Sequence, residues 1–301
     1  MSETQPTGAR RLDAIFEAAK AEGRGALMPF VCGQHPKPGA TAETLKALEG
    51  AGADIVEIGF PFSDPIADGP VIADAMHVAL QNGATIAGLI DEVASVRSEV
   101  SMGLVAMVTV SIVSRLGGPS AFCERIKAAG FDGMIVPDLP IEEAKQVSTA
   151  ADAAGLGLAM LVAPSTSKDR AAQIVGACRG FVYVLAQTGI TGERSEGPQI
   201  EKRAAGLRTL TDLPLAVGFG ISTGEHVAAA CRHADAAIVG SALVRRMGGS
   251  DRPAQAAAEF VREIAGSTAK PEAMSASSPN DSEPTPASDI APSTGEEDSQ
   301  S

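Results

Sequence analysis

Strand-like and helix-like segments alternate along this chain, and that rhythm limits its fold more than any other feature. Each of eight short apolar stretches is followed by a stretch whose apolar residues recur at helical spacing. The predicted strands cover residues 26–32, 55–59, 102–110, 133–136, 156–162, 181–185, 215–218 and 236–239. Eight such units over about 240 residues are typical of a (β/α)8 TIM barrel. Alternation alone leaves an open, doubly wound sheet as the alternative, although no G-x-G-x-x-G motif follows the first strand.

The predicted helices share the 3.6-residue spacing of apolar side chains, and one of them precedes the first strand. They cover residues 12–23, 41–51, 71–81, 86–100, 119–129, 141–151, 168–178, 200–210, 223–231 and 253–264, and Ser241 opens a further short helix. We therefore predict an α/β barrel domain over residues 9–266, with an extra helix at its N-terminal end.

Both ends of the chain are predicted to be disordered. Residues 1–8 are polar and show no helical pattern. Residues 267–301 are rich in Ser, Pro, Ala and Glu, with seven acidic residues against one basic residue. Such a segment cannot bury enough apolar surface to offset the entropy lost on ordering. We expect an acidic C-terminal tail without a fold of its own.

Composition excludes several classes of function. The net charge of −13 argues against nucleic acid, because phosphate contacts need Lys and Arg, and aromatic residues for base stacking make up only 3% of the chain. The four scattered cysteines form no C-x-x-C pair, so we expect buried free thiols in a reducing cytoplasm. No apolar run reaches the roughly 18 residues that span a bilayer, and the first residues lack the apolar region of a secretory signal.

An acidic motif at the end of the second predicted strand is the strongest candidate for a site. Residues 57–70 read E-I-G-F-P-F-S-D-P-I-A-D-G-P. Glu57 lies in the middle of an apolar strand, where a carboxylate is costly to bury and needs a partner or a task. Asp64 and Asp68 follow on a loop that its prolines make stiff. This loop falls at the C-terminal end of a strand, where barrels of this kind carry their active sites.

Glycine-rich loops after later strands predict a phosphate site. Gly220 follows the seventh strand, and Gly240 and Ser241 follow the eighth and open a short helix. Glycine lets backbone N–H groups approach an anion, and a helix N-terminus adds partial positive charge. Two such loops at the seventh and eighth strands form the recurrent phosphate site of barrels. Gly192, in the long Gly/Thr/Ser loop after the sixth strand, is a predicted third contributor, and that loop suits a mobile lid.

The motif at residues 57–70 is similar to the signature of the tryptophan synthase α subunit family, and the likeness extends over residues 9–264. The resemblance implies a TIM barrel that cleaves indole-3-glycerol phosphate to indole and glyceraldehyde 3-phosphate by a retro-aldol step. It implies that Glu57 is a general acid/base, protonating the indole ring at C3. It implies that Asp68 accepts the indole N–H and stabilises the positive charge that develops there. The structural alternatives are a carboxylate satisfied by backbone amides at Glu57 and a turn-forming aspartate at Asp68.

The same resemblance assigns substrate-binding residues. It places Tyr183, the only tyrosine, in the active site beside Glu57. It implies that Thr191 helps to close the lid. It implies an apolar slot for the indole ring lined by Phe30, Ile72, Phe219 and Ile238. For each of these apolar residues, ordinary core packing is the alternative.

The resemblance also implies partners. It implies an α2β2 heterotetramer in which indole passes to a β subunit that holds PLP, with no cofactor on this chain. None of the four histidines lies in a ligand pattern, so no metal site is predicted. Two loops depart from the family: residues 33–39 lack the family's Gly-Asp-Pro, and residues 109–114 lack its Tyr/Asn/Pro cluster. Both belong to the face that meets the β subunit in the family, which leaves the docking mode open. Asp138, after the fourth strand, is predicted to be a helix cap or a subunit contact.

Three other functions stay open from the residues alone. A stand-alone indole-releasing lyase would act without a β chain. Another phosphate-binding barrel enzyme, such as an isomerase or a synthase that forms indole-glycerol phosphate, would share the glycine loops. The synthase would need a catalytic lysine on an early strand, and strands one to three have none. A non-catalytic regulatory subunit would not need the pair Glu57 and Asp68.

Overall fold

The computed structural model describes residues 7–65, 68–186, 197–218 and 220–270. The chain divides into a unit of residues 1–271 and a second unit of residues 272–301. The second unit and residues 1–6 lie outside the described residues, and so do the predictions made for them. The folded domain extends slightly past the expected boundary at residue 266. Thr268 is buried, and the Lys270 N–H donates to the Gly23 carbonyl at 2.9 Å.

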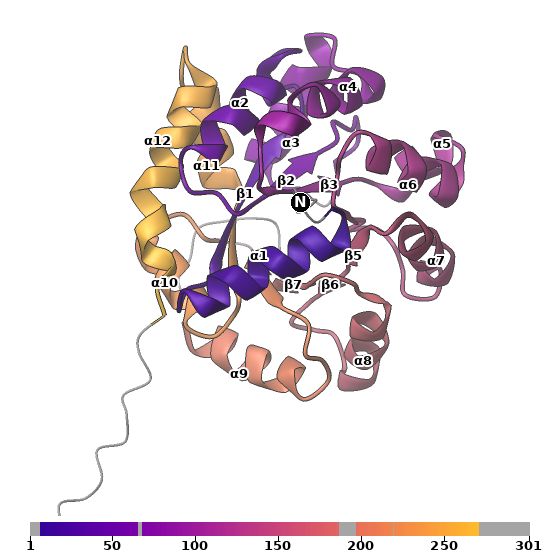
Figure 1. The fold of residues 1–301 in the computed structure, drawn as a ribbon, viewed down its shortest axis with the longest axis vertical. Helices are drawn as coiled ribbons and strands as arrows, with labels where there is room; N and C mark the ends of the chain where they lie inside the picture. The colour runs from indigo at the N-terminus through magenta and orange to yellow at the C-terminus, as the bar shows by residue number, and fades with distance from the viewer. Residues whose placement is uncertain (1–6, 66–67, 187–196, 219, 271–301) are drawn as a thin grey trace, which may run out of the picture. The chain divides into compact units, whose positions relative to one another are not determined.

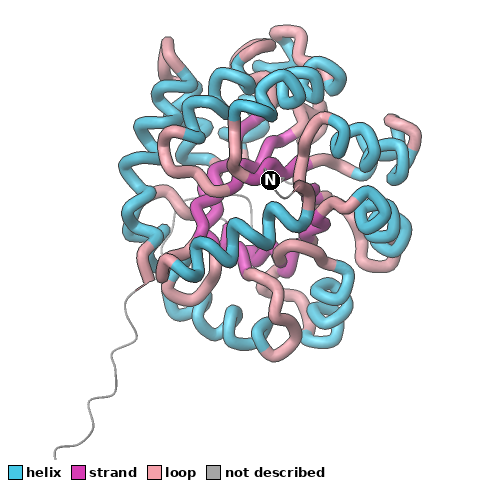
Figure 2. Tube along the Cα trace, viewed as in Figure 1, coloured by secondary structure: helices cyan, strands magenta, loops and turns pink. Residues whose placement is uncertain are grey.

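The strands form one parallel sheet. They are β1 (Ala26–Cys32), β2 (Ile55–Gly59), β3 (Gly103–Met107), β4 (Gly133–Ile135), β5 (Gly157–Ala159), β6 (Leu161–Val162), β7 (Val182–Leu185), β8 (Leu215–Gly218) and β9 (Ala236–Val239). Their order in the sheet is β5-β4-β3-β2-β1-β9-β8-β7-β6. In Figures 1 and 2 the strands form a central ring with helices around it.

The two ends of this sheet are consecutive in the chain. Only Met160 separates β5, which pairs with β4, from β6, which pairs with β7. The backbone of Met160 belongs to the same ladder, since its carbonyl accepts the Tyr183 N–H at 3.2 Å. The predicted fifth strand therefore closes the sheet by pairing with one neighbour through its first half and with the other through its second. The TIM-barrel prediction is confirmed, and the open-sheet alternative is wrong.

The helices follow the strands as the sequence pattern predicts, with one addition. They are α1 (Ala9–Ala21), α2 (Ala40–Glu49), α3 (Pro70–Gln81), α4 (Ile86–Val96), α5 (Val110–Arg115), α6 (Gly118–Ala128), α7 (Ala144–Ala154), α8 (Lys168–Ala177), α9 (Gly197–Arg208), α10 (Gly224–Cys231), α11 (Ser241–Gly248) and α12 (Pro253–Ala265), with 3-10 turns η1 (Arg97–Glu99) and η2 (Gly266–Thr268). The addition is α5, in a stretch that the sequence pattern predicted to be strand and loop. Its N-terminal N–H, on Val110, is bonded by the Asp138 carboxylate at 3.0 and 3.2 Å.

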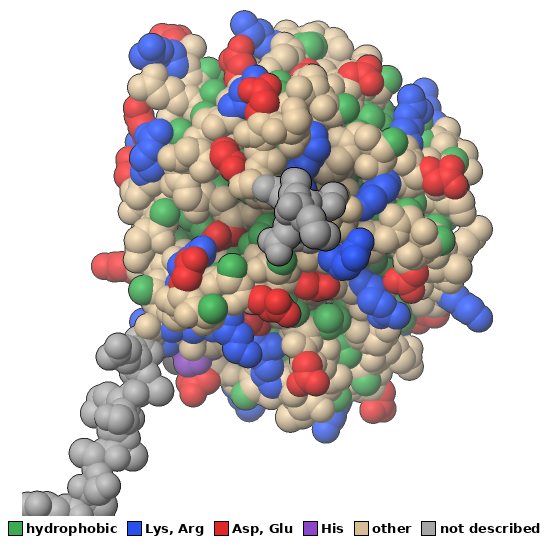
Figure 3. Space-filling model, viewed as in Figure 1, with side chains coloured by type: hydrophobic (Ala, Val, Ile, Leu, Met, Phe, Trp, Pro, Cys, Tyr) green, Lys and Arg blue, Asp and Glu red, His purple; other side chains and the backbone are tan. Residues whose placement is uncertain are grey.

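Helix α1 closes the N-terminal end of the barrel. It crosses the ring of strands in Figure 1, and its apolar face of Leu12, Phe16 and Ala19 is buried among inward-facing strand residues. Small residues make room for it. A Cβ added at Gly103 or at Gly157 would lie 2.8 or 2.9 Å from the Leu12 side chain. Around α1, basic and acidic side chains are interspersed over the surface seen in Figure 3. The other end of the barrel is left for a site.

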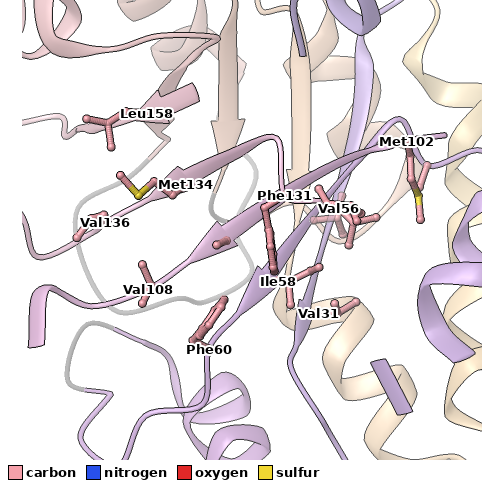
Figure 4. Packing of buried hydrophobic residues seen from close by; sticks show 14 of the residues in the cluster. Val31, Val56, Ile58, Phe60, Met102, Val108, Phe131, Met134, Val136 and Leu158 are labelled. Atoms are coloured by element: carbon pink, nitrogen blue, oxygen red, sulfur yellow. The ribbon is translucent and has the colours of Figure 1, made fainter. Parts of the chain in front are cut away.

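The two faces of each strand enter different cores, as their alternation predicts. On β2, Val56 and Ile58 point outward into the layer between sheet and helices, which Figure 4 shows. Phe60 follows them into this layer, with its ring centroid 6.1 Å from that of Phe122. Ile55 points inward and joins the core inside the barrel. Glu57, two residues along the strand, therefore also faces the interior.

Candidate active site

Glu57 is a fully buried acid in the barrel interior. It lies on β2, with Phe30 of β1 and Val105 of β3 as its register partners, and its exposed fraction is 0%. Neither carboxylate oxygen has a hydrogen-bond partner among the described residues. Burial alone raises the pKa of Glu57 from 4.5 to about 8. At neutral pH the side chain is thus mainly a protonated acid, ready to give up a proton, and no backbone amide within the described part satisfies it.

Asp68 lies at the end of the acidic loop, two residues before α3 begins at Pro70. Its N–H donates to the Pro65 carbonyl at 3.1 Å. The residue is half-buried, and burial raises the pKa of its carboxyl group to about 6. Its charge also helps burial to raise the pKa of the Cys32 thiol, so the carboxylate lies near the inward-facing end of β1.

Tyr183 lies near both acids. It lies on β7 and is buried in the inner core. Burial raises its pKa most, and the charges of Glu57 and Asp68 raise it further, so both carboxyl groups lie near this phenol. Gly218 on β8 makes room for it, because a Cβ there would overlap the Tyr183 hydroxyl group. The structure therefore brings three of the predicted residues to one region.

An apolar cluster adjoins this region. Phe30 and Ile72 are buried in one cluster, on β1 and on α3. Gly59 leaves space for the Phe30 ring, since a Cβ there would lie 2.6 Å from its Cζ. Ile238, on β9, is buried instead in the inner core with Tyr183. The three slot residues that the structure describes thus occupy two adjoining clusters, one around Phe30 and one around Tyr183.

Three inward-facing residues were missed by the sequence analysis. Met107 packs against both clusters, and Leu161 and Leu185 pack against the inner core, all three only partly buried. They lie at or near the C-terminal ends of β3, β6 and β7. Strand parity was a usable signal for them, because Met107 is two residues after the inward-facing Val105 and Leu185 two residues after Tyr183.

The predicted phosphate-binding glycines lie at the ends of β8 and β9. Gly240 precedes α11, and the first N–H groups of that helix have no partner within it. A Cβ added at Gly240 would lie 3.7 Å from Phe30 Cβ and 3.8 Å from Ile72 Cδ1. The start of α11, with the half-buried Ser241, therefore borders the apolar cluster. Gly220 has a φ of +78°, a conformation that favours glycine.

Three other predicted site residues, Thr191, Gly192 and Phe219, lie outside the described residues. Asp64 is exposed on the acidic loop. Asp138 is a helix cap, for the unpredicted helix α5.

No group of three or more His, Cys, Asp or Glu side chains is placed to hold a metal ion within the described ranges. No helix in the part of the chain that is described is long and apolar enough to cross a membrane.

Comparison with known proteins identifies the family. The family model described as "Tryptophan synthase alpha chain" matches residues 16–272. The chain belongs to the tryptophan synthase α chain family. The other phosphate-binding barrel enzymes considered from the sequence are thereby excluded, and the resemblance is confirmed.

Other members of this family match most of this chain. The tryptophan synthase alpha chain of a Synechococcus strain is 45% identical over 234 residues, which are 77% of this chain and 87% of the relative. That of Chloroflexus aggregans is 43% identical over 263 residues, covering 86% and 98% of the two chains. Among solved structures, Mycobacterium tuberculosis tryptophan synthase gives a TM-score of 0.81 at 33% identity and covers 88% of this chain and 99% of that chain. The tryptophan synthase subunit alpha of Legionella pneumophila gives 0.78 at 31% identity, covering 86% and 98%.

Proposed function

We propose that this α chain cleaves indole-3-glycerol phosphate to indole and D-glyceraldehyde 3-phosphate. The observation that carries the proposal is Glu57, a fully buried acid with no hydrogen-bond partner among the described residues and a pKa raised to about 8. It lies near the Tyr183 phenol, whose pKa the charges of both Glu57 and Asp68 raise. A group that is protonated at neutral pH and can ionise near it suits a step that both gives and takes a proton.

In the proposed reaction, Glu57 gives its proton to C3 of the indole ring. Positive charge then develops on the ring nitrogen, and the Asp68 carboxylate stabilises it by accepting the N–H. The bond between C3 and the side-chain carbinol carbon breaks, and its electron pair returns to the ring. The carbinol hydroxyl becomes the aldehyde and releases its proton to the Glu57 carboxylate, which restores the starting acid. Atoms and charge balance without a cofactor on this chain.

The remaining site residues bind the substrate. Phe30, Ile72, Phe219 and Ile238 are proposed to hold the indole ring, with Tyr183 beside Glu57. Backbone N–H groups at Gly192, Gly220, Gly240 and Ser241 are proposed to bind the phosphate, and Thr191 to help close the lid. The first N–H groups of α11, which have no partner within that helix, support the phosphate assignment, because a helix N-terminus favours an anion.

The proposed partner is a tryptophan synthase β subunit in an α2β2 assembly, which would take up indole for L-tryptophan synthesis with its own PLP. Family membership supports a β partner. The four cysteines are buried free thiols, which supports a reducing compartment, and we propose the cytoplasm.

The deciding experiment measures indole release from indole-3-glycerol phosphate, with and without added β chain. We expect Glu57→Gln to lose about 10²–10⁴-fold in kcat while a non-reactive analogue still binds, since the amide cannot transfer the proton. Asp68→Asn should also lose kcat rather than only raise KM. Turnover like that of the wild type in Glu57→Gln would refute the acid/base role. Full activity without the β chain would favour a stand-alone lyase.

A further inference from the structure

A buried histidine lies behind the apolar cluster and takes no part in the proposed reaction. His35, in the loop after β1, is 6% exposed. Neither ring nitrogen has a hydrogen-bond partner of good geometry among the described residues. Burial lowers the pKa of His35, and the backbone of Ala75 opposes this shift, which places the ring against α3. An unsatisfied buried ring is costly, so its presence asks for an explanation.

His35 also borders a second helix. A Cβ added at Gly248, the last residue of α11, would lie 3.7 Å from His35 Nε2. The ring therefore lies near Ala75 of α3 and near the last residue of α11. Elsewhere these two helices pack directly, since Ile72 and Val244 share one buried cluster. The helices thus pack directly near Ile72 and Val244, while farther along them the imidazole of His35 lies near both.

The loop that carries His35 is firmly anchored by its neighbour Gln34. The Gln34 N–H donates to Thr41 Oγ1 at 2.7 Å, and its side-chain amide donates to Glu92 Oε1 at 2.5 Å. Its side-chain carbonyl accepts the Thr85 N–H at 2.8 Å. These bonds connect the loop to α2, to α4 and to the turn before α4. The Gln34 bonds thus hold the loop to α2 and α4, and the Pro36 carbonyl, next to His35, accepts a bond at 2.8 Å from the Asn82 side chain at the C-terminal end of α3.

We propose that His35 is a positioning residue whose ring sets the spacing between α3 and α11. This rests on the proposed function, because the two helices carry opposite ends of the proposed site. Ile72 lies in the first turn of α3 and Asp68 two residues before that helix, where the indole ring would bind, and Ser241 begins α11, where the phosphate would bind. The width of one buried ring therefore determines whether a single ligand reaches both ends.

The test compares a ligand that joins both ends with its two halves. The joined ligand is a non-reactive analogue in which a three-carbon chain connects indole to phosphate, and the halves are indole and inorganic phosphate. His35→Ala should let α3 and α11 move closer together. We expect it to weaken binding of the joined ligand about tenfold or more, because errors of about 1 Å are costly in a positioned site. Binding of each half should stay within about twofold. In turnover, kcat/KM should fall by a similar factor.

Two further variants keep the test decisive if His35→Ala does not fold. Gly248→Leu should widen the gap from the α11 side and cause the same selective loss. Gly248→Ala is the matched control, since its Cβ meets the ring at ordinary contact distance and should leave binding unchanged. His35→Phe keeps a ring of similar width and should retain the joined ligand.

Equal losses for the joined ligand and its halves, or no loss in either gap-changing variant, would overturn the spacer role. A loss in His35→Phe as large as in His35→Ala would also overturn it, because the ring nitrogens would then matter rather than the width. If the wild type itself fails to bind the joined ligand, the proposed function is wrong, and that result is distinct from both.

Discussion

Replacing Glu57 with Gln is expected to stabilise the protein while it removes activity. The native state holds the Glu57 proton much more tightly than the unfolded chain does, because the folded pKa is about 8 against 4.5. The free energy of unfolding is therefore independent of this group below about pH 4.5, falls as the pH rises, and reaches its full loss above about pH 8. Glutamine has no such proton, so Glu57→Gln escapes the loss.

The magnitude follows from the pKa values. Each pH unit between 4.5 and 8 costs the wild type about 1.4 kcal/mol, so the whole range costs about 5 kcal/mol. Between pH 5.0 and pH 7.0 the variant should gain about 3 kcal/mol on the wild type. The amide carries two N–H donors against the single O–H of the protonated acid, and this difference adds an offset that does not change with pH, so the slope of the difference still reports the missing proton.

The assay is urea unfolding of both proteins at a series of pH values from 5 to 8. We plot the difference in unfolding free energy between variant and wild type against pH. Glu57→Leu is a second variant, and its curve should have the same slope as that of Glu57→Gln even if its offset differs, since the slope belongs to the missing proton. Parallel wild-type and variant curves would show that the carboxyl group titrates alike in both states, and the reasoning from burial would fail.

Two further predictions concern residues that support the site and the closed end of the barrel. Gly218→Ala should displace the Tyr183 ring and lower kcat at least tenfold, measured by indole release, because its Cβ would overlap the Tyr183 hydroxyl. A variant with unchanged kcat would mean that the phenol has no fixed role. Asp132→Ala should lower the free energy of unfolding by about 3–5 kcal/mol, since it leaves the nearly buried Arg11 and Arg97 without their shared carboxylate. A loss below about 1 kcal/mol in urea unfolding would refute that ion-pair account.

Local patterns predicted most of the barrel. The limits of β1, β2, β8 and β9 agree with the predicted ranges, because each strand is a short apolar run buried on both faces. Parity along β2 explains why Glu57 faces the interior together with Ile55, since alternation holds wherever the ladder is regular.

Non-local contacts explain the misses. The third strand was predicted to run to Val110 and to be followed by a loop, whereas helix α5 begins at Val110, whose N–H donates to Asp138, 28 residues away in the sequence. The predicted fifth strand is divided because its two halves pair with strands on opposite sides. No residue pattern within the strand predicts that division. The His35 spacer was likewise out of reach, because its role depends on two helices that begin long after it in the sequence.

The division of the fifth strand at Met160 gives the barrel a seam within a strand rather than between two strands. The two edge strands of the sheet, β5 and β6, are joined by one continuous backbone. They therefore cannot slide past one another without stretching that backbone. Cutting the chain at Met160 would separate β5 from β6 and leave both edge strands without their covalent connection. A protein split at Met160 should therefore need both fragments together to form the closed barrel. Each fragment alone would carry an open sheet with an unpaired edge strand.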